Sequence, residues 1–438
     1  YVLGETITIK LYGIGETETY THTIVKGQTG ASHELVRSIS YAIQDGLKNS
    51  AAYEVNTAYE TLFVRAKDRV AGAFAVEVTY SGSAKLTVEN DYEFAPQILW
   101  RADFREQALV KLALANAGAV DDGVRFHGPA ATELILTVPA TCEGVEHPTL
   151  TCRAHVRIYH NASGPRVRTS VCFERCKTFS AATQQLTYSA KIFNGNALLE
   201  VVPAFDHRYA ARWRRVVWHN EASPEMHFRH DKEYFVGISK AVLNYDTSIE
   251  MSVAEIGRDR ARLEQAKTNQ ALHGPMGYGL WTPDMPGTGG RPDIGPSPKW
   301  YVTHILAQTP DTLATMVEQA DAAAATWSVH YRDETTGLPV SIKDWPNISV
   351  VQTYRSTPAI AHQGPKKGLY DITTSSPDNA HQPDIAYIPY LVTGDYYYHE
   401  ELQFWASWCV ASRPADYRDF DKGWLFSQNV RAIGWSLR

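Results

Sequence analysis

The sequence predicts a multidomain α+β protein with three parts in order along the chain. We expect a small α/β adaptor module over residues 1–90, a β-sandwich-like domain over 91–251, and an α/α-toroid-like helical domain over 252–438. Two observations lead to this prediction. Before Ser252, apolar and polar residues alternate in short segments, which is the period of β-strands. From Ser252 onward, apolar residues recur every three or four positions, as they do in amphipathic helices.

The composition is that of an ordinary globular protein. The chain has 438 residues, of which 21% are charged and 44% hydrophobic, so it is long enough for several domain cores. Its formal net charge is −6, and no basic stripe follows a predicted helix, so nucleic acid is not expected as a partner. No run approaches the roughly 20 apolar residues of a membrane-spanning helix. Because the chain starts at Tyr1 without Met and ends inside a helical pattern, we expect a fragment whose toroid is incomplete.

The N-terminal module is predicted to contain two strands, one helix and three more strands. The helix is expected over 31–47, where Leu35, Ile39 and Ile43 are four residues apart and share one face. The strands are expected over 5–12, 19–25, 53–57, 61–66 and 73–80. Because so many short strands share a single helix, one face or edge of their sheet is expected to dock on a partner.

The middle domain is predicted to be strand-rich with irregular connections. Alternating segments occur over 133–138, 152–159, 166–176, 186–193 and 197–202. About eight strands over about 150 residues are typical of a β-sandwich. The pair Asn194-Gly195 favours a hairpin between the last two of these segments.

A basic and aromatic segment over 207–219 ends this domain. It contains four arginines, Arg208, Arg212, Arg214 and Arg215. We favour an interface in which these arginines pair with carboxylates of the next domain. The alternative is a surface that binds a glycan or a phosphate.

The last part is predicted to be helical. Helices are expected over 252–273, 299–308, 312–327, 384–392, 396–411 and 428–438. Ser252 and Glu255 form a capping-box pattern at the start of the first helix. Paired helices with long loops at one end favour an α/α toroid. An apolar flank is expected near the C-terminal end, at Trp424, Phe426 and Trp435.

Cysteine and histidine spacing does not favour a metal site. The five cysteines are Cys142, Cys152, Cys172, Cys176 and Cys409. Their spacing departs from the short paired knuckles of zinc sites, so we expect buried free thiols, with one disulfide as the remaining option. His227 and His230 lie three apart on a strand-like segment, which would place them on opposite faces. Neither a metal nor another cofactor is expected.

Two long loops are the predicted functional region. One spans 274–298 and the other leads into 381–390. Loops of this length inside a compact domain are usually functional. Both loops precede helices, and helix N-termini favour anionic ligands such as a uronate. If they form one site, the two loops must meet.

Three side chains of the 274–298 loop suit a saccharide. Arg291 can clamp a carboxylate in bidentate fashion, and Trp281 or Tyr278 can stack on a sugar ring. In the second loop, His381 can exchange a proton near neutral pH.

The N-terminal module resembles a small module that recurs in bacteriophage tail proteins. In that module a strand pair leads into an amphipathic helix and then into a strand that ends in a basic turn. The matching stretches here are 38–44 and 62–72, about a fifth of the chain with its surroundings. The alternative is a generic α+β adaptor.

Residues 213–438 resemble a family of large proteins encoded by phages and prophages. The motifs that carry this resemblance lie at 276–295, 329–333 and 380–402. By general shape the family is similar to six-hairpin glycosidases and to toroidal polysaccharide lyases. The resemblance implies a tail- or baseplate-associated virion protein, oligomeric within the particle, that contacts other tail proteins and cell-surface polysaccharide. Outside a virion, it implies an extracellular protein.

The likeness to toroidal lyases implies three roles. A lyase neutralises the uronate carboxylate, removes the C5 proton and protonates the leaving group. Candidates are Arg291, Gln382, His381, Tyr387 and Tyr390. For His381, the alternative is an ordinary loop histidine.

An inverting glycosidase would instead need two carboxylates about 6.5–9.5 Å apart. The available acids are Asp284, Asp293, Asp384, Glu400 and Glu401. For Asp293 and Asp384, the alternative role is capping of a helix N-terminus. Three functions therefore remain open: a tail protein that binds and cleaves polysaccharide, a lyase or glycoside hydrolase with an accessory β domain, and a purely structural tail protein.

Overall fold

The computed structural model describes most of the chain, in segments. These are residues 2–12, 16–29, 33–58, 61–67, 75–82, 97–102, 124–142, 145–160, 165–177, 179, 186–194, 197–218, 229–267, 274–283, 290–351, 377–425 and 430–437. The chain forms two units. The first comprises Tyr1–Ile98, Leu186–Ala190 and Val201–Ala204, and the second comprises Leu99–Gln185, Lys191–Glu200 and Phe205–Arg438.

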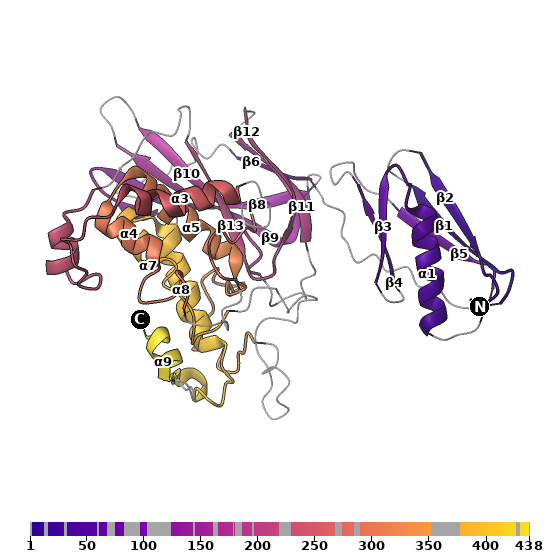
Figure 1. Cartoon of the computed structure of the whole chain (residues 1–438). Helices are drawn as coiled ribbons and strands as arrows, with labels where there is room; N and C mark the ends of the chain where they lie inside the picture. Colours follow the sequence, from indigo (N-terminus) through magenta and orange to yellow (C-terminus); the bar gives the residue numbers. More distant parts are fainter. Residues whose placement is uncertain are drawn as a thin grey trace. The chain divides into compact units, whose positions relative to one another are not determined.

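The N-terminal part has the predicted order of two strands, a helix and three strands (Figure 1). Its elements are β1 (Thr6–Tyr12), β2 (Glu18–Thr23), α1 (His33–Leu47), β3 (Tyr53–Ala58), β4 (Thr61–Ala66) and β5 (Ala75–Tyr80). The antiparallel sheet has the order β2-β1-β5, and β3 and β4 form a separate hairpin. Thus β2 and β5 are the edges of this sheet.

The two faces of this small sheet differ in polarity. On one face, Ile7 and Ile9 of β1 belong to a buried cluster with Ile39 and Ile43 of α1. The opposite face is polar: Lys10 pairs with Glu77 at 3.8 Å, and the hydroxyls of Thr8 and Thr21 are 3.0 Å apart. A partner would therefore meet either a polar face or a strand edge.

The second sheet has eight strands, of which β6, β7 and β13 were not predicted from the sequence. Its strands are β6 (Gln97–Ala102), β7 (Val124–His127), β8 (Ala131–Cys142), β9 (Val145–Tyr159), β10 (Arg166–Glu174), β11 (Leu186–Asn194), β12 (Ala197–His207) and β13 (Arg212–Trp218). The order is β12-β11-β6-β8-β9-β10-β13, with β7 on β8. Neighbouring β11 and β12 agree with the predicted hairpin, whose turn lies outside the described residues.

The strands described in this part form one sheet, whereas the sequence predicts a β-sandwich. Register explains the difference. Arg153 of β9 is paired with Cys172 of β10, which in turn is paired with Arg214 of β13. Directly paired residues share a face, so one face of the sheet carries many charged groups. That face packs against helices through ion pairs instead of against a second apolar sheet.

The helical part follows the predicted spans to within three residues at each end, except for the first helix, which was predicted over 252–273 and ends at Ala266. It contains the π-helix η1 (Glu233–Ile238), which was not predicted, and α3 (Val253–Ala266), α4 (Lys299–Ala307), α5 (Pro310–Thr326), α7 (Tyr387–Thr393), α8 (Tyr396–Ala411), the 3-10 turn η2 (Phe420–Lys422) and α9 (Val430–Ser436). The capping box of α3 is confirmed, since Ser252 Oγ accepts from Glu255 N at 3.2 Å.

The helices surround a core rich in aromatic rings. Trp281, Trp300, Trp327, Trp405 and Trp408 all belong to it. In Figure 1, α5, α7 and α8 lie together beside β9 and β13. The described helices pack on the sheet, and their arrangement does not show a toroid.

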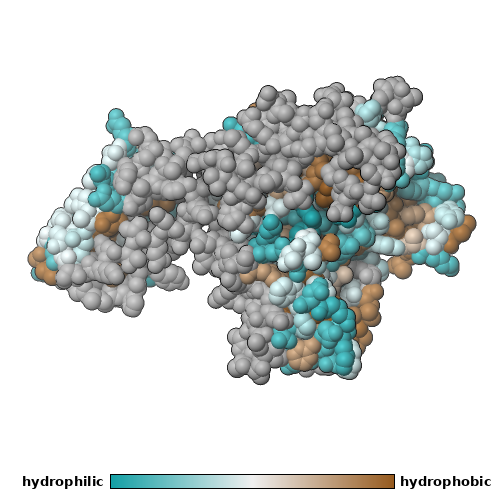
Figure 2. All heavy atoms as spheres, turned by 180° about the vertical axis from the view of Figure 1, so that it is seen from behind, coloured by the Kyte–Doolittle hydropathy of each residue, from teal (hydrophilic) through white to brown (hydrophobic). Residues whose placement is uncertain are grey.

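Two further sequence predictions concern the surface and the membrane. Of the three residues predicted to form an apolar flank near the C-terminal end, Trp424 is 62% exposed, Trp435 is partly buried, and Phe426 lies outside the described residues. Val430 and Leu437, which were not predicted, are 84% and 72% exposed. Figure 2 shows the molecule from behind, with hydrophobic and hydrophilic residues interspersed over the described surface that is visible in this view. Among the described helices, none has the length and apolar character needed to cross a membrane.

Candidate functional site

The loop over 274–298 is fixed to the rest of the fold by its backbone. Arg208 Nη1 donates to Met276 O at 2.8 Å, and Leu280 N donates to Gln319 Oε1 at 3.1 Å. Gly279 has φ +55°, and a Cβ at this position would lie 2.7 Å from the Gln319 side chain. The loop is therefore closely seated on α5, although residues 284–289, with Asp284, lie outside the described part.

Trp281 belongs to the core and not to a binding surface. Its ring is 2% exposed and lies 4.9 Å from the Trp300 ring and 5.7 Å from the Trp327 ring. Its Nε1 donates to Gln319 O at 2.6 Å. The predicted stacking of Trp281 on a sugar is therefore corrected to a packing role, because apolar burial holds the ring inside. Tyr278 packs against the same core and is partly buried.

Arg291 joins the two predicted loops. Its Nη2 donates to His381 O at 3.0 Å, and its Nε lies 2.9 Å from Asp293 Oδ1. Asp293 is 1% exposed and also accepts from Thr282 N at 2.8 Å. The prediction that the loops meet is confirmed. The guanidinium therefore contacts Asp293 of its own loop and His381 of the other loop, so the main role of Arg291 in this structure is to bridge the two loops.

His381 lies between a carboxylate and a guanidinium. Its Nδ1 contacts Asp378 Oδ2, and its Nε2 is 2.6 Å from Arg431 Nη2 of α9. Because a guanidinium can only donate, Nε2 accepts and the proton is on Nδ1. This arrangement fixes the ring and its tautomer. A base at Nε2 would become free only if Arg431 moved away.

The remaining predicted residues are also held by partners. Asp384 is 7% exposed, and its Oδ1 accepts from Tyr387 N at 2.9 Å, which matches the predicted capping alternative. Gln382 Oε1 accepts from the Cys409 thiol at 3.2 Å. Tyr387 is 38% exposed and donates its hydroxyl proton to Ala241 O at 2.7 Å. The Tyr390 ring, in contrast, faces the ring of His399.

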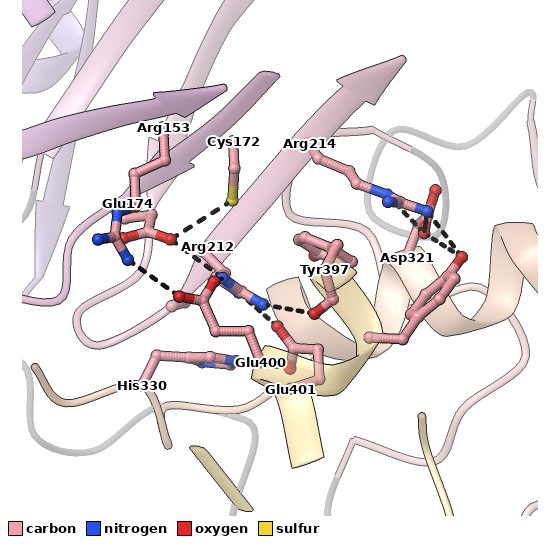
Figure 3. Close-up of polar contacts among 12 residues, drawn as sticks. Arg153, Cys172, Glu174, Arg212, Arg214, Asp321, His330, Tyr397, Glu400 and Glu401 are labelled. Atoms are coloured by element: carbon pink, nitrogen blue, oxygen red, sulfur yellow. Dashed lines mark hydrogen bonds and ion pairs between the residues drawn. The ribbon is translucent and has the colours of Figure 1, made fainter. Parts of the chain in front are cut away.

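Arg212 of β13 lies at the centre of a buried network (Figure 3). Its guanidinium contacts Glu174 at 3.0 Å, Glu400 at 2.5 Å, and Glu401. Its Nη2 donates to Tyr397 O at 3.0 Å. Arg212 is fully buried. Because the two acids on α8 and the acid on β10 share this one cation, Arg212 fastens α8 to the sheet.

A second layer of cations completes the network. Arg332 donates to Glu174 at 2.7 Å and lies 2.8 Å from Glu400, while Arg153 contacts Glu400 at 2.9 Å. His330 Nε2 is 2.8 Å from Glu401 Oε2. Burial raises the pKa of Glu174, but the ion pair with Arg332 outweighs it and lowers that pKa to about 2.

Glu400 and Glu401 are therefore poor candidates for a hydrolase pair. Burial opposes their ionisation, yet Arg332, Arg212 and Arg153 hold the pKa of Glu400 well below its usual range. Arg212 and His330 likewise lower the pKa of Glu401. A general acid needs a proton near the working pH, and these two carboxylates have none to give.

The N-terminus of α8 is fastened in a similar way. Asp395 accepts from Tyr397 N at 3.2 Å, as an N-cap does. It also contacts Arg214 at 2.9 Å and Arg168 at 3.1 Å. The two guanidinium groups overcome the effect of burial and hold the pKa of Asp395 far below its usual range. Arg214 in addition contacts Asp321 of α5 at 2.7 Å.

The interface predicted from the arginine-rich segment is confirmed by Arg212 and Arg214. Arg153, Glu174, His330 and Arg332 were not predicted as part of it. A signal existed for Arg153, because Arg153, His155 and Arg157 alternate with apolar residues along β9. This pattern ordinarily indicates a face turned to solvent, and here that face is buried.

The described residues contain no group of three or more metal-ligating side chains. His230 stacks on Phe235 and its Nε2 faces Val392 O at 3.2 Å, while His227 lies outside the described residues. Four cysteines are free and buried: Cys152, Cys172, Cys176 and Cys409. The side chain of Cys142 is outside the described set.

Acid is expected to destabilise the protein through this network. In the folded chain the pKa values of Glu174, Glu400, Glu401 and Asp395 are lower than in the unfolded chain. The stability that they contribute is therefore complete above about pH 5 and is lost as the pH falls toward about 2. Urea unfolding between pH 7 and pH 3 should show a falling free energy of unfolding.

Two buried histidines extend the acid-induced loss of stability to higher pH, and one buried acid opposes this loss. Burial lowers the pKa of His155 to about 4 and that of His207 well below its usual value. Only the unfolded chain then takes up their protons below about pH 6.5. Burial raises the pKa of Glu133, which acts in the opposite sense. A free energy of unfolding that stays constant or rises from pH 7 to pH 3 would contradict the prediction.

Comparison with known proteins finds no matching family, no matching curated sequence and no matching solved structure. The function is therefore argued from the residues and their geometry.

Proposed function

We propose that this chain is a tail- or baseplate-associated protein of a bacteriophage that binds cell-surface polysaccharide. The observation that supports this location for the binding site is the contact between Arg291 and His381, which are 90 positions apart in the sequence. Two loops that were expected to form one site meet at this point. Binding is favoured over cleavage because Asp293, Glu400 and Glu401 are buried in ion pairs.

An exposed arginine at this junction supports an acidic saccharide as the ligand. Arg431 is exposed beside His381, so a ligand carboxylate can reach its guanidinium from solvent. Arginine binds carboxylates with paired hydrogen bonds, which gives both affinity and orientation. Tyr387, at 38% exposure, offers an aromatic ring at the start of α7.

A lyase or glycoside hydrolase is the second candidate. It is favoured by the Asp378–His381 pair, because an acid that holds Nδ1 turns Nε2 into a base. In this version Arg431 would leave Nε2 when substrate binds, and Tyr387 would act as the acid. A purely structural tail protein is the third candidate, supported by the many contacts that these side chains make within the chain.

The tail assignment rests on the sequence resemblance, together with the small sheet of the N-terminal part. Its outer face is polar, so association with other tail proteins would use the edges β2 or β5. We place the protein in the virion, or otherwise outside the cell, and as an oligomer within the particle. The α/α toroid stays a prediction, for which the adjacent pairs α4–α5 and α7–α8 are the support.

Binding of acidic oligosaccharides by the full chain tests this proposal. The probes are hexamers of galacturonate, of mannuronate and guluronate, and of glucuronate, followed by calorimetry. Arg291→Ala is expected to weaken binding by about tenfold or more, because it removes both a cation and the bridge between the loops. Arg262→Ala, which removes an arginine on α3 with a 53% exposed side chain, is the control.

His381→Ala separates binding from turnover. If the protein only binds saccharide, His381→Ala should bind the hexamers as well as the unaltered chain or more weakly, and no variant should show turnover. A lyase should release unsaturated product, detected by absorbance, and lose this activity in His381→Ala while it still binds. If the unaltered chain binds none of the three hexamers, the proposed function is wrong.

A further inference from the structure

A row of partly buried aromatic rings lies at the turn between α7 and α8. The ring of His399 is 5.3 Å from the ring of Tyr390 on one side and 5.3 Å from the ring of Tyr396 on the other. Tyr396 is in turn covered by the guanidinium of Arg125 at 5.0 Å. All three rings are only partly buried, and Arg125 is exposed. The row therefore reaches the surface and ends in a cation.

Phe126, next to Arg125 on β7, extends the same surface. It is 43% exposed, and the guanidinium of Arg157 lies 5.7 Å from its ring. Large aromatic rings that remain exposed beside polar groups mark binding surfaces more often than scattered apolar residues do. Partly exposed rings of this kind can stack on the C–H faces of a sugar.

The described charges around this turn leave one cation in excess. The cations are Arg125, Arg157, Arg168 and Arg214, and the anions are Glu133, Asp321 and Asp395. Arg157 is committed to Glu133, and Arg168 and Arg214 are committed to Asp395. Arg125 is the exposed member of the set, so the surface is complementary to a negatively charged ligand.

We infer that the surface formed by Tyr390, His399, Tyr396, Arg125 and Phe126 binds a uronate-containing segment of polysaccharide. The sugar rings pack against the exposed parts of these aromatic rings, and a carboxylate of the glycan pairs with Arg125. The inference rests on the proposed function and adds a second contact region, distinct from the Arg291–His381 junction. Tyr387, three residues before Tyr390 on α7, donates its hydroxyl proton to Ala241 O and is not a member of this row.

Two substitutions test the surface with the same uronate hexamers. Arg125→Gln removes the exposed charge and is expected to weaken binding by about tenfold, the value of one charge-assisted contact. Tyr396→Leu removes a stacking face and is expected to weaken binding by about threefold to tenfold. Arg262→Gln is the matched control, since it removes an exposed arginine of α3. Melting temperatures establish that each variant is folded.

A neutral glucose hexamer separates charge from stacking. Binding of this probe should be weaker than that of the uronates, and Arg125→Gln should leave it unchanged. If the unaltered chain binds uronates and both variants bind them equally well, this inference is wrong while the proposed function stands. If Tyr396→Leu fails to fold, Arg125→Gln alone decides. If no uronate hexamer binds to the unaltered chain, the inference and the proposed function fail together.

Discussion

Arg212→Ala is expected to lower the free energy of unfolding by about 3–5 kcal/mol. Arg212 is fully buried and forms ion pairs with Glu174, Glu400 and Glu401 at once. Its removal leaves the three carboxylates with only Arg332 and Arg153 as guanidinium partners. The excess negative charge would then lie in a space closed to water, where an unpaired charge is costly. The carbonyl of Tyr397 loses a donor as well. Urea unfolding at pH 7, followed by tryptophan fluorescence, measures the effect.

Arg215→Ala is the matched control on the same strand. Arg215 pairs with Glu200 at 2.8 Å, and their side chains are 31% and 35% exposed. Such an ion pair contributes about 0–1 kcal/mol. Arg212→Lys should fall between the two variants, because a single ammonium keeps the charge but cannot reach all the acceptors. If Arg212→Ala is no less stable than Arg215→Ala, the network does not hold α8 on the sheet.

Local patterns were sufficient to predict most secondary structure. The predicted span of α8 is the one observed, Tyr396–Ala411, and the strands of the N-terminal part differ by only a few residues from those predicted. Periodicity is set by neighbours within a few positions, so the sequence carries it directly. The strand β13 was not predicted, because Arg212 and Arg214 interrupt its apolar pattern.

The interior of the second unit could not be predicted in the same way. Arg153 and Glu400 are separated by 247 positions, and no local rule relates them. Polar residues that alternate along β9 resemble a solvent face until the partner acids on α8 are known. The Arg-rich segment was the exception, since clustered arginines are costly to bury without acids and so predict an acidic partner surface.

The motifs behind the phage resemblance have a structural role in this fold. His330 and Arg332 come from the motif at 329–333, and Glu400 and Glu401 from the motif at 380–402. All four are members of the buried network. Specific residues in a motif need not touch a ligand, because the members of a buried ion network are restricted by the partners that they must satisfy.

The location of the candidate site could be predicted, but the roles of its side chains could not. The two long loops meet as expected at Arg291 and His381. Which side chains face solvent depends on packing by distant segments, such as Gln319 of α5 against Trp281. Aromatic residues on a loop are consistent with both a binding surface and a core.

The variant Trp281→Ala distinguishes these two roles. Trp281 is 2% exposed and lies among Trp300 and Trp327, so removal of its ring should leave a cavity and lower the free energy of unfolding by about 3–5 kcal/mol. Trp424→Ala is the control: that ring is 62% exposed, and its removal should change stability by only about 0.5 kcal/mol.

Stability and binding must be measured on the same Trp281 variants. Trp281→Phe keeps most of the apolar surface but loses the donor to Gln319 O, so it should cost less than Trp281→Ala, about 1–3 kcal/mol. A core role requires that uronate binding by folded Trp281→Phe be unchanged. If Trp281→Ala were as stable as the unaltered chain and had lost saccharide binding, the ring would be a stacking platform after all. The burial of Trp281 would then belong to a closed loop conformation that opens for the ligand.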